Sequence, residues 1–199
     1  MPQNYSYDVF LSYRRVPPVI DWVRNHFHPL LTQWLPSALP PRYKTRIFID
    51  ELQIETGATW PLQLQEALKN SRCLVPVWSP EYFGSKWCLA ELKSMQKREQ
   101  LLGLRSPQQP QGLIYPVVFS DGENFPKYAQ AIQQKDLSQW NIPDVVFRQH
   151  LDYIDFVRQI KNLVGELARL IRRAPRWADW PVEIPRATPP RPKVRLPRL

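Results

Sequence analysis

Short apolar runs alternate with segments of helical periodicity along the first third of the chain. Residues 7–13 (YDVFLSY) form a β-favouring run that stops at two arginines, which is typical of a buried strand. Between residues 19 and 35 the apolar positions recur at helical spacing until a proline cluster ends the pattern. Residues 46–50 (RIFID) predict a second strand, which a polar loop containing Gly57 follows.

The same alternation continues toward the C-terminus. A helix with Pro61 in its first turn is followed by a third strand over residues 73–79. Ser79 and Pro80 then predict the start of another helix, with the serine as its cap. Three further elements are expected, namely a fourth strand over 113–120, a short edge strand over 145–147 and a long last helix over 152–171.

Strands that alternate with helices imply a parallel sheet that is covered on both faces. We therefore predict an α/β fold, a flavodoxin-like open doubly wound sheet of about five parallel strands with helices on both faces. Seven prolines among the last 26 residues exclude a packed core there. We expect a domain over 5–172 and a basic Pro/Arg-rich tail over 173–199 that is extended or disordered, so that deleting 176–199 leaves the fold intact.

Composition places the charge in that tail. The chain of 199 residues has a net charge of +9, and residues 172–199 hold eight basic and two acidic side chains. The rest of the chain is therefore close to neutral, which does not suit a nucleic-acid-binding fold. The tail contacts an anionic partner or serves only to keep the chain in solution.

The sequence shows no signal peptide, transmembrane segment or metal-binding motif. The N-terminus lacks the features of a signal peptide, and two cysteines, Cys73 and Cys88, indicate a reduced, cytoplasmic setting. No run of about 18 apolar residues predicts a transmembrane segment. The three histidines have no metal-ligand spacing with the cysteines, so no metal is expected.

The carboxyl ends of parallel strands meet at one rim of such a sheet, and ligands bind there. In this chain the rim gathers a hydroxyl, cations, carboxylates and an indole. These side chains are Ser12, Arg14, Arg15, Asp50, Trp87 and Glu91. Trp87 and Glu91 are four residues apart and share a helix face if this segment is helical. The set favours a ligand that is both anionic and aromatic.

Each of these side chains also has a structural explanation. An isolated glutamate on a helix is usually solvated, and a tryptophan such as Trp87 is more often part of the core. Arg14 and Arg15 would cover the end of a strand, and Asp50 would cap the following loop. The rim residues alone therefore leave both interpretations open.

Four runs occur in order along the chain: YDVFLSYRR, RIFID with a loop to GATWPLQLQEAL, VPVWSPEYFGSKWCLAEL, and IYPVVF. Together they resemble the Toll/interleukin-1 receptor (TIR) domain over roughly residues 5–172. The form SKWCLAEL is most similar to TIR domains of plant immune receptors and bacterial antiphage systems, many of which cleave NAD. The resemblance implies that Glu91, in the Trp-Cys-x-x-Glu motif, is catalytic. It also implies that residues 51–60 form a loop through which TIR domains self-assemble.

The implied activity is that of an NAD+ glycohydrolase or cyclase in prokaryotic antiviral defence, with NAD+ as substrate and no cofactor. Nicotinamide leaves as a neutral molecule, so one carboxylate suffices, whereas O-glycoside hydrolysis needs an acid as well. Glu91 would stabilise the oxocarbenium-like charge on the ribose. Water, the adenine, a ribose hydroxyl or another nucleophile would capture that centre, so the product remains open.

The other rim residues would bind the substrate. Trp87 would pack against nicotinamide or its ribose, and Arg14 or Arg15 would pair with pyrophosphate oxygens. Ser12 and Asp50 would shape the pocket.

Two other functions fit parts of the pattern. A non-catalytic adaptor would act through TIR–TIR association or with a partner effector or sensor protein, and has no need of Glu91. A response-regulator receiver would use Asp50 as phosphoacceptor, but it needs further acids at the end of the first strand to hold magnesium. This chain has Ser12 and two arginines there instead.

Overall fold

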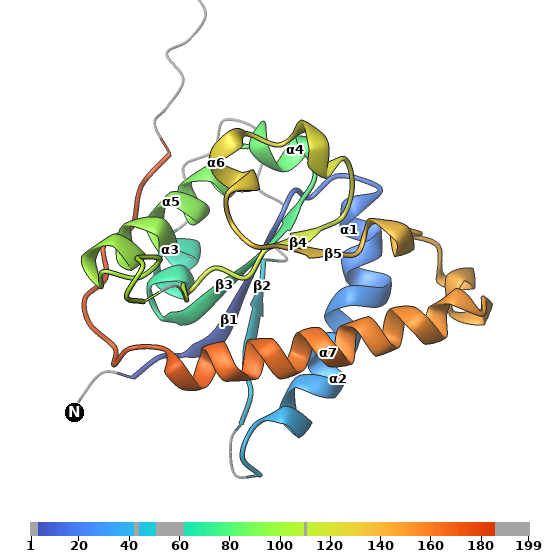
Figure 1. The fold of residues 1–199 in the computed structure, drawn as a ribbon, viewed down its shortest axis with the longest axis horizontal. Coiled ribbons are helices and arrows are strands. Elements are labelled where there is room, and N and C mark those ends of the chain that lie inside the picture. The colour runs from blue at the N-terminus through green and yellow to red at the C-terminus, as the bar shows by residue number, and fades with distance from the viewer. Residues whose placement is uncertain (1–3, 42–43, 51–61, 110, 186–199) are drawn as a thin grey trace, which may run out of the picture.

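A computed structural model describes residues 4–41, 44–50, 62–109 and 111–185 of the chain. They contain a five-stranded parallel sheet with the order β2-β1-β3-β4-β5 (Figure 1). The strands are β1 (Tyr7–Tyr13), β2 (Ile47–Ile49), β3 (Ser71–Trp78), β4 (Val117–Val118) and β5 (Lys135–Asp136). This topology confirms the predicted flavodoxin-like fold class.

The first strand lies between β2 and β3 in the sheet and has the predicted bounds. It pairs with β2 from Val9↔Ile47 onward and with β3 as far as Tyr13↔Val77. The predicted fourth strand is reduced to β4 and one isolated bridge at Ile114. Pro116 lies between the bridge and the strand, and it has no backbone N–H to donate to a ladder.

The predicted edge strand at residues 145–147 is wrong. These residues lie in a 3₁₀ helix, η5 (Val145–Gln149), and the edge strand is β5 instead. The Asp144 carboxylate caps the helix by accepting a hydrogen bond from the Val146 N–H at 2.8 Å. Phe147 turns inward against the rings of His26 and Phe156. Local capping and one buried aromatic therefore override the β propensity of the two valines.

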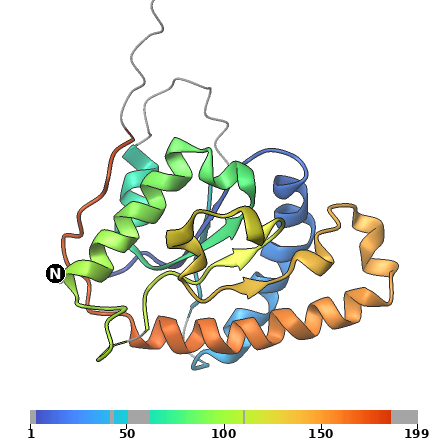
Figure 2. The same ribbon diagram turned by 45° about the horizontal axis from the view of Figure 1, so that its top comes forward.

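Helices cover both faces of the sheet (Figures 1 and 2). One face carries α1 (Val19–Trp22), the π-helical turn η1 (Val23–Phe27), α2 (His28–Trp34), η2 (Leu35–Ala38) and α7 (Asp152–Arg173). The other carries α3 (Leu62–Lys69), α4 (Pro80–Phe83), α5 (Lys86–Leu101) and α6 (Lys127–Gln130). The 3₁₀ turn η3 (Gly122–Asn124) follows β4, and η4 (Ser138–Trp140) follows β5.

The predicted helix over 19–35 contains a π-helical turn that the periodicity did not indicate. Pro29 follows this turn, and a proline ring clashes with the carbonyl four residues earlier in a regular α-helix. Widening the helix to a π turn relieves that clash.

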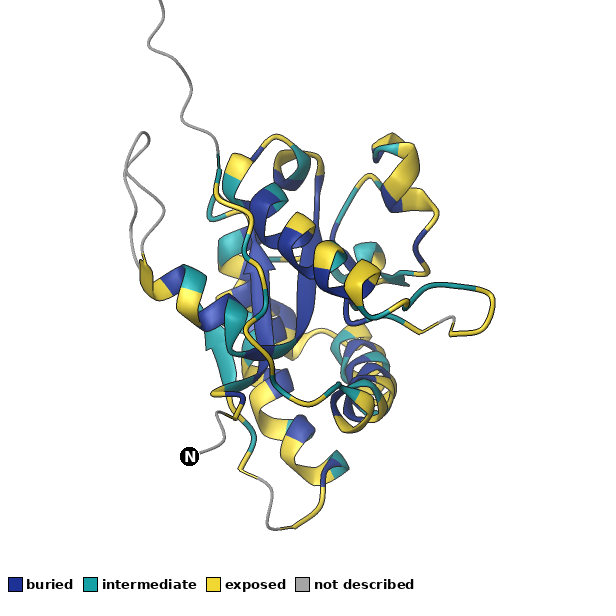
Figure 3. Ribbon diagram, turned by 90° about the vertical axis from the view of Figure 1, so that its left-hand side faces the viewer, coloured by how far each residue is buried: buried dark blue, intermediate teal, exposed yellow. Residues whose placement is uncertain are grey.

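Alternate residues of the central strands enter two separate cores. Val9 and Leu11 pack with α1, α2 and α7, whereas Phe10 packs with the α3 and α5 side. Figure 3 shows the central strands as buried between these layers. Burial on both faces explains why the strands are continuous apolar runs. Because successive side chains of β1 point to opposite faces of the sheet, only alternate residues of β1 can contact α5.

The beginning of the tail packs on the domain, which the sequence did not predict. Residues 174–185 have no helix or strand, but the Trp177 indole N–H donates to Asn70 Oδ1 at 2.8 Å. The Trp180 indole N–H donates to the Tyr5 hydroxyl at 3.1 Å. These contacts argue against the expectation that residues 176–199 are dispensable. The boundaries of the domain and tail remain predictions, and residues 186–199 lie outside the described residues.

Candidate active site

Glu91 and Ser12 meet between α5 and the end of β1. The Glu91 side chain is buried, with 6% of the residue exposed, and its Oε2 lies 2.5 Å from Ser12 Oγ. Ser12 has the same parity as Phe10, so it points to the face of the sheet that α5 covers. The structure therefore joins two of the predicted site residues at the carboxyl end of β1.

A helix break sets the orientation of Glu91. The helix predicted from Ser79 ends after one turn as α4, and α5 begins at Lys86. Ser85 caps α5, because its Oγ accepts a hydrogen bond from the Cys88 N–H at 3.3 Å. Ser79 and Pro80 occupy the predicted cap and first positions of α4, but the Ser79 side chain makes no cap hydrogen bond. With α5 starting at Lys86, Glu91 lies in the second turn of the helix.

Tyr82 belongs to the same hydrogen-bond network and was missed from the sequence. It is fully buried in α4, and its hydroxyl lies 3.0 Å from Ser12 Oγ and 3.2 Å from the Cys88 carbonyl oxygen. The signal was present in the run SPEYF, because a tyrosine in an apolar helix needs a partner for its hydroxyl.

This chain of hydroxyls can serve both protonation states of Glu91. When the carboxyl is protonated, it donates to Ser12, Ser12 donates to Tyr82, and Tyr82 donates to the Cys88 carbonyl. When it is ionised, Ser12 donates to the carboxylate instead. Each state therefore keeps its buried polar atoms satisfied.

Burial, with a smaller contribution from the nearby charge of Asp50, raises the pKa of Glu91 to about 8. The Ser12 hydrogen bond and the positive charge of Arg15 act in the opposite direction. The Glu91 carboxyl is therefore largely protonated at neutral pH. A cationic group brought close to it would lower this pKa and favour the carboxylate.

Arg15 and Asp50 form an ion pair across the ends of β1 and β2. Arg15 Nη1 lies 2.9 Å from Asp50 Oδ2, and both side chains are mostly buried. The pair places opposite charges at the same rim as Glu91, and both charges act on its pKa. Arg14, the neighbouring residue, is exposed. The structure thus separates the two arginines that the sequence could not distinguish.

Trp87 lies one helical turn before Glu91 on α5. It is half-buried and packs against the hydrophobic cluster that contains Phe10 and Tyr82. Part of the surface of Trp87 remains accessible. The loop 51–60, including Ile54 and Gly57, lies outside the described residues.

Comparison with known proteins identifies the family. A model of the TIR domain family matches residues 9–171, so the chain belongs to the TIR domain family. It is 32% identical over 89 residues to TMV resistance protein N of Nicotiana glutinosa, covering 45% of this chain and 7% of that protein. It is 28% identical over 152 residues to disease resistance protein RUN1 of Vitis rotundifolia, covering 70% of this chain and 10% of that protein. The chain thus spans a tenth or less of these relatives' length.

Two solved structures also resemble the chain. The TIR domain of the Toll-related receptor TRR-2 from Hydra magnipapillata has a TM-score of 0.46 and 18% identity, covering 77% of this chain and 99% of that one. The TIR domains of the activated Roq1 resistosome have a TM-score of 0.41 and 24% identity, covering 82% and 84%. Among the described residues, no helix is long and apolar enough to cross a membrane.

Proposed function

We propose that this TIR domain is an NAD+ nucleosidase that cleaves the bond between nicotinamide and ribose, with Glu91 as its catalytic residue. The observation that carries the proposal is the buried Glu91 carboxyl, held by Ser12 at the carboxyl end of β1. This is the rim where open α/β sheets bind ligands.

The raised pKa of Glu91 suits a cationic substrate. Binding places the positive nicotinamide ring near the carboxyl and favours loss of its proton. The bond between ribose C1′ and the ring nitrogen then breaks, and its electron pair leaves with neutral nicotinamide. The Glu91 carboxylate stabilises the positive charge that develops on C1′ and the ring oxygen. Water adds to C1′ and loses a proton to give ADP-ribose, or a substrate nucleophile gives a cyclic or substituted product.

The remaining rim residues divide the work of substrate binding. Arg14 is exposed and available to pyrophosphate oxygens, whereas Arg15 is held by Asp50 and shapes the wall of the site. Trp87 offers its accessible ring surface to nicotinamide or the ribose.

The names of the plant relatives, which include disease resistance proteins, support a role in immune signalling. We place it in prokaryotic antiviral defence, in the cytoplasm, where the domain self-associates through residues 51–60 or acts with an effector or sensor protein. In this proposal, association of two copies completes the site, so the isolated domain has low activity.

Release of nicotinamide from NAD+ tests the proposal. We expect the concentrated wild-type protein to release nicotinamide and the Glu91→Ala and Glu91→Gln variants to lose nearly all activity. Glu81→Ala is a matched control, because Glu81 is an exposed glutamate in the preceding helix. Equal activity of the wild type and a folded Glu91 variant would overturn the assignment.

One observation favours a second candidate, a non-catalytic adaptor. Glu91 is buried and its carboxyl already has a partner in Ser12, as a purely structural glutamate would. An adaptor would bind other TIR domains through residues 51–60 and leave NAD+ intact in its assembled state. Variants of Ile54 or Gly57 that abolish association, in a protein that never consumes NAD+, would support it.

A further inference from the structure

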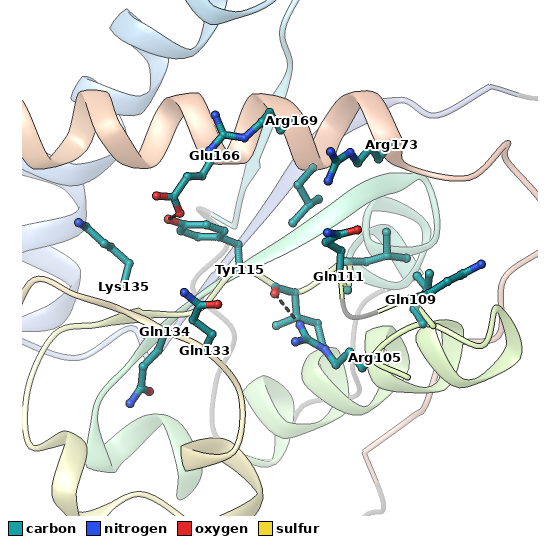
Figure 4. Close-up of a pocket in the computed structure, with 15 residues that line it drawn as sticks. Arg105, Gln109, Gln111, Tyr115, Gln133, Gln134, Lys135, Glu166, Arg169 and Arg173 are labelled. Carbon is teal, nitrogen blue, oxygen red and sulfur yellow. Dashed lines mark hydrogen bonds between the residues drawn. The ribbon is translucent and has the colours of Figure 1, made fainter. Parts of the chain in front are cut away.

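A polar groove lies at the opposite end of the sheet from Glu91. It has a volume of about 700 Å³ and is formed by the loop after α5, the residues that lead into β4 and β5, and one side of α7 (Figure 4). Tyr115 precedes β4 and Lys135 begins β5, so the groove is at the amino ends of these strands. Ser12 and Glu91 lie at the carboxyl end of β1 and do not line the groove.

One wall of the groove is built around Arg105 and is fixed in position. Arg105 Nε donates to the buried Glu99 carboxylate at 2.7 Å, and its Nη2 donates to the Ile114 carbonyl at 2.7 Å (Figure 4). The backbone of Arg105 has φ 55°, a left-handed conformation that costs a non-glycine residue free energy. A Cβ at Gly112 would lie 2.2 Å from the Glu99 carboxylate, so glycine is required beside this pair.

This fixed wall leaves hydrogen-bonding capacity facing the groove. Arg105 has five N–H donors, and the hydrogen bonds to Glu99 and Ile114 use two of them. Glu99 also accepts hydrogen bonds from the backbone N–H groups of Leu113 and Ile114. The guanidinium is thus oriented before any ligand arrives, which reduces the entropy that binding would cost.

The facing wall comes from α7 and adds positive charge. Arg169 and Arg173 are one helical turn apart, line the groove and are exposed. In the described part of the chain neither has an ion pair or a hydrogen bond to another side chain. Glu166 is the acidic residue of the lining, and its carboxylate accepts a hydrogen bond from the Tyr115 hydroxyl at 2.6 Å (Figure 4).

Lys135 completes the set of cations at the far end of the groove. Its Nζ donates to Gln159 Oε1 at 2.7 Å, which still leaves two donors. Four cations and one carboxylate therefore line a single hollow, and Glu99 behind the wall balances Arg105. The excess positive charge favours an anionic ligand.

We infer that this groove binds a phosphorylated small molecule of nucleotide size. The planar guanidinium groups match phosphate oxygens, and the volume is in the range of about 300 to 1,000 Å³ that small-molecule sites occupy. Leu104, Leu170 and the Tyr115 ring supply apolar surface for a base or sugar. The cations converge on one hollow, whereas a nucleic-acid-binding surface spreads them along a face or stripe.

Calorimetric titration of the full chain with ATP at low ionic strength tests this inference. We expect binding by the wild type and at least about tenfold weaker binding by the Arg169→Gln/Arg173→Gln double variant, since two charge-assisted contacts to the phosphates are lost. The matched control is Arg158→Gln, which changes an exposed arginine of α7 outside the groove and should bind like the wild type.

Further titrations separate this groove from the Glu91 site. The Glu91→Ala variant should retain the wild-type affinity for ATP, and tripolyphosphate should bind more weakly than ATP because it lacks a base and sugar. Absence of ATP binding, or equal affinity of the double variant and the wild type, would overturn the inference. Equally tight binding of tripolyphosphate would overturn the assignment of a ligand with a base or sugar.

Discussion

Ser12 Oγ lies 2.5 Å from Glu91 Oε2, and this contact connects β1 to α5, the helix that covers it. The serine is the last residue of β1 that points toward α5, and the glutamate faces the sheet from the second turn of that helix. A buried carboxyl with one hydroxyl partner is sensitive to its surroundings, because no cation contacts it directly in the described residues. Its protonation therefore provides a direct experimental readout of this site.

Stability should depend on pH through Glu91. The ordinary pKa of a glutamate is 4.5, and burial raises the pKa of Glu91 to about 8 in the folded chain. As the pH rises between these values, the unfolded chain loses the Glu91 proton while the folded chain keeps it, so folding stability falls. The full contribution is present below about pH 4.5 and is lost as the pH passes about 8.

Denaturant unfolding of wild type and Glu91→Gln across this pH range measures the effect. The wild type should lose up to a few kcal/mol relative to the variant, at about 1.4 kcal/mol per pKa unit. Glu81→Gln, an exposed substitution, should follow the wild type. Parallel profiles for the wild type and Glu91→Gln would show that the Glu91 pKa is not raised.

Removing the Ser12 hydroxyl should raise the pKa of Glu91 further. The Ser12 hydrogen bond stabilises the carboxylate and so lowers this pKa. If ionised Glu91 is required for NAD+ cleavage, Ser12→Ala should shift the rising limb of the pH–rate profile to higher pH. The variant should also lose about 1 to 3 kcal/mol of stability, because a buried carboxyl loses its partner. An unchanged pH–rate profile would contradict the proposed coupling.

Tyr82→Phe tests the outer part of the hydroxyl network. The substitution removes the hydroxyl between Ser12 and the Cys88 carbonyl without changing the packing of the ring. We expect a loss of about 1 kcal/mol in stability and a smaller shift of the pH–rate profile than Ser12→Ala causes. Tyr128→Phe is the matched control, because Tyr128 is 49% exposed. If Tyr82→Phe behaved like Tyr128→Phe in both measurements, the network would have no influence on Glu91.

The sequence was sufficient to predict a parallel sheet and the approach of Ser12 and Glu91 to the same rim, but not the hydrogen bond between them. The alternation of side chains along residues 7–13 and the four-residue spacing of Trp87 and Glu91 depend only on local backbone geometry. Sequence periodicity reports this local geometry directly. Tyr82 was missed because its partners are 70 residues away at Ser12 and on the following helix. The edge strand was misplaced because two polar residues, the half-buried Lys135 and the exposed Asp136, form it without an apolar pattern.

The tail illustrates the same limitation, because proline content reports the absence of regular structure and not the absence of contacts. Trp180 covers the buried Arg98 side chain, whose guanidinium carbon lies 5.1 Å from the centre of the indole ring. The Glu183 N–H donates to Ser94 Oγ at 2.8 Å. Ser94 and Arg98 belong to α5, the helix that carries Glu91. The beginning of the tail therefore holds this helix against the domain.

Truncation after Arg173 should consequently destabilise the domain and reduce activity. We expect Trp180→Ala alone to cost about 1 to 3 kcal/mol, from lost apolar burial and a lost cation–π contact. Ile184→Ala is the control within the same segment, because Ile184 is 63% exposed, and it should change stability little. Denaturant unfolding and nicotinamide release, measured on the same preparations, would show whether the two effects occur together. Unchanged stability in both the truncated chain and Trp180→Ala would mean that α5 keeps its position without the tail.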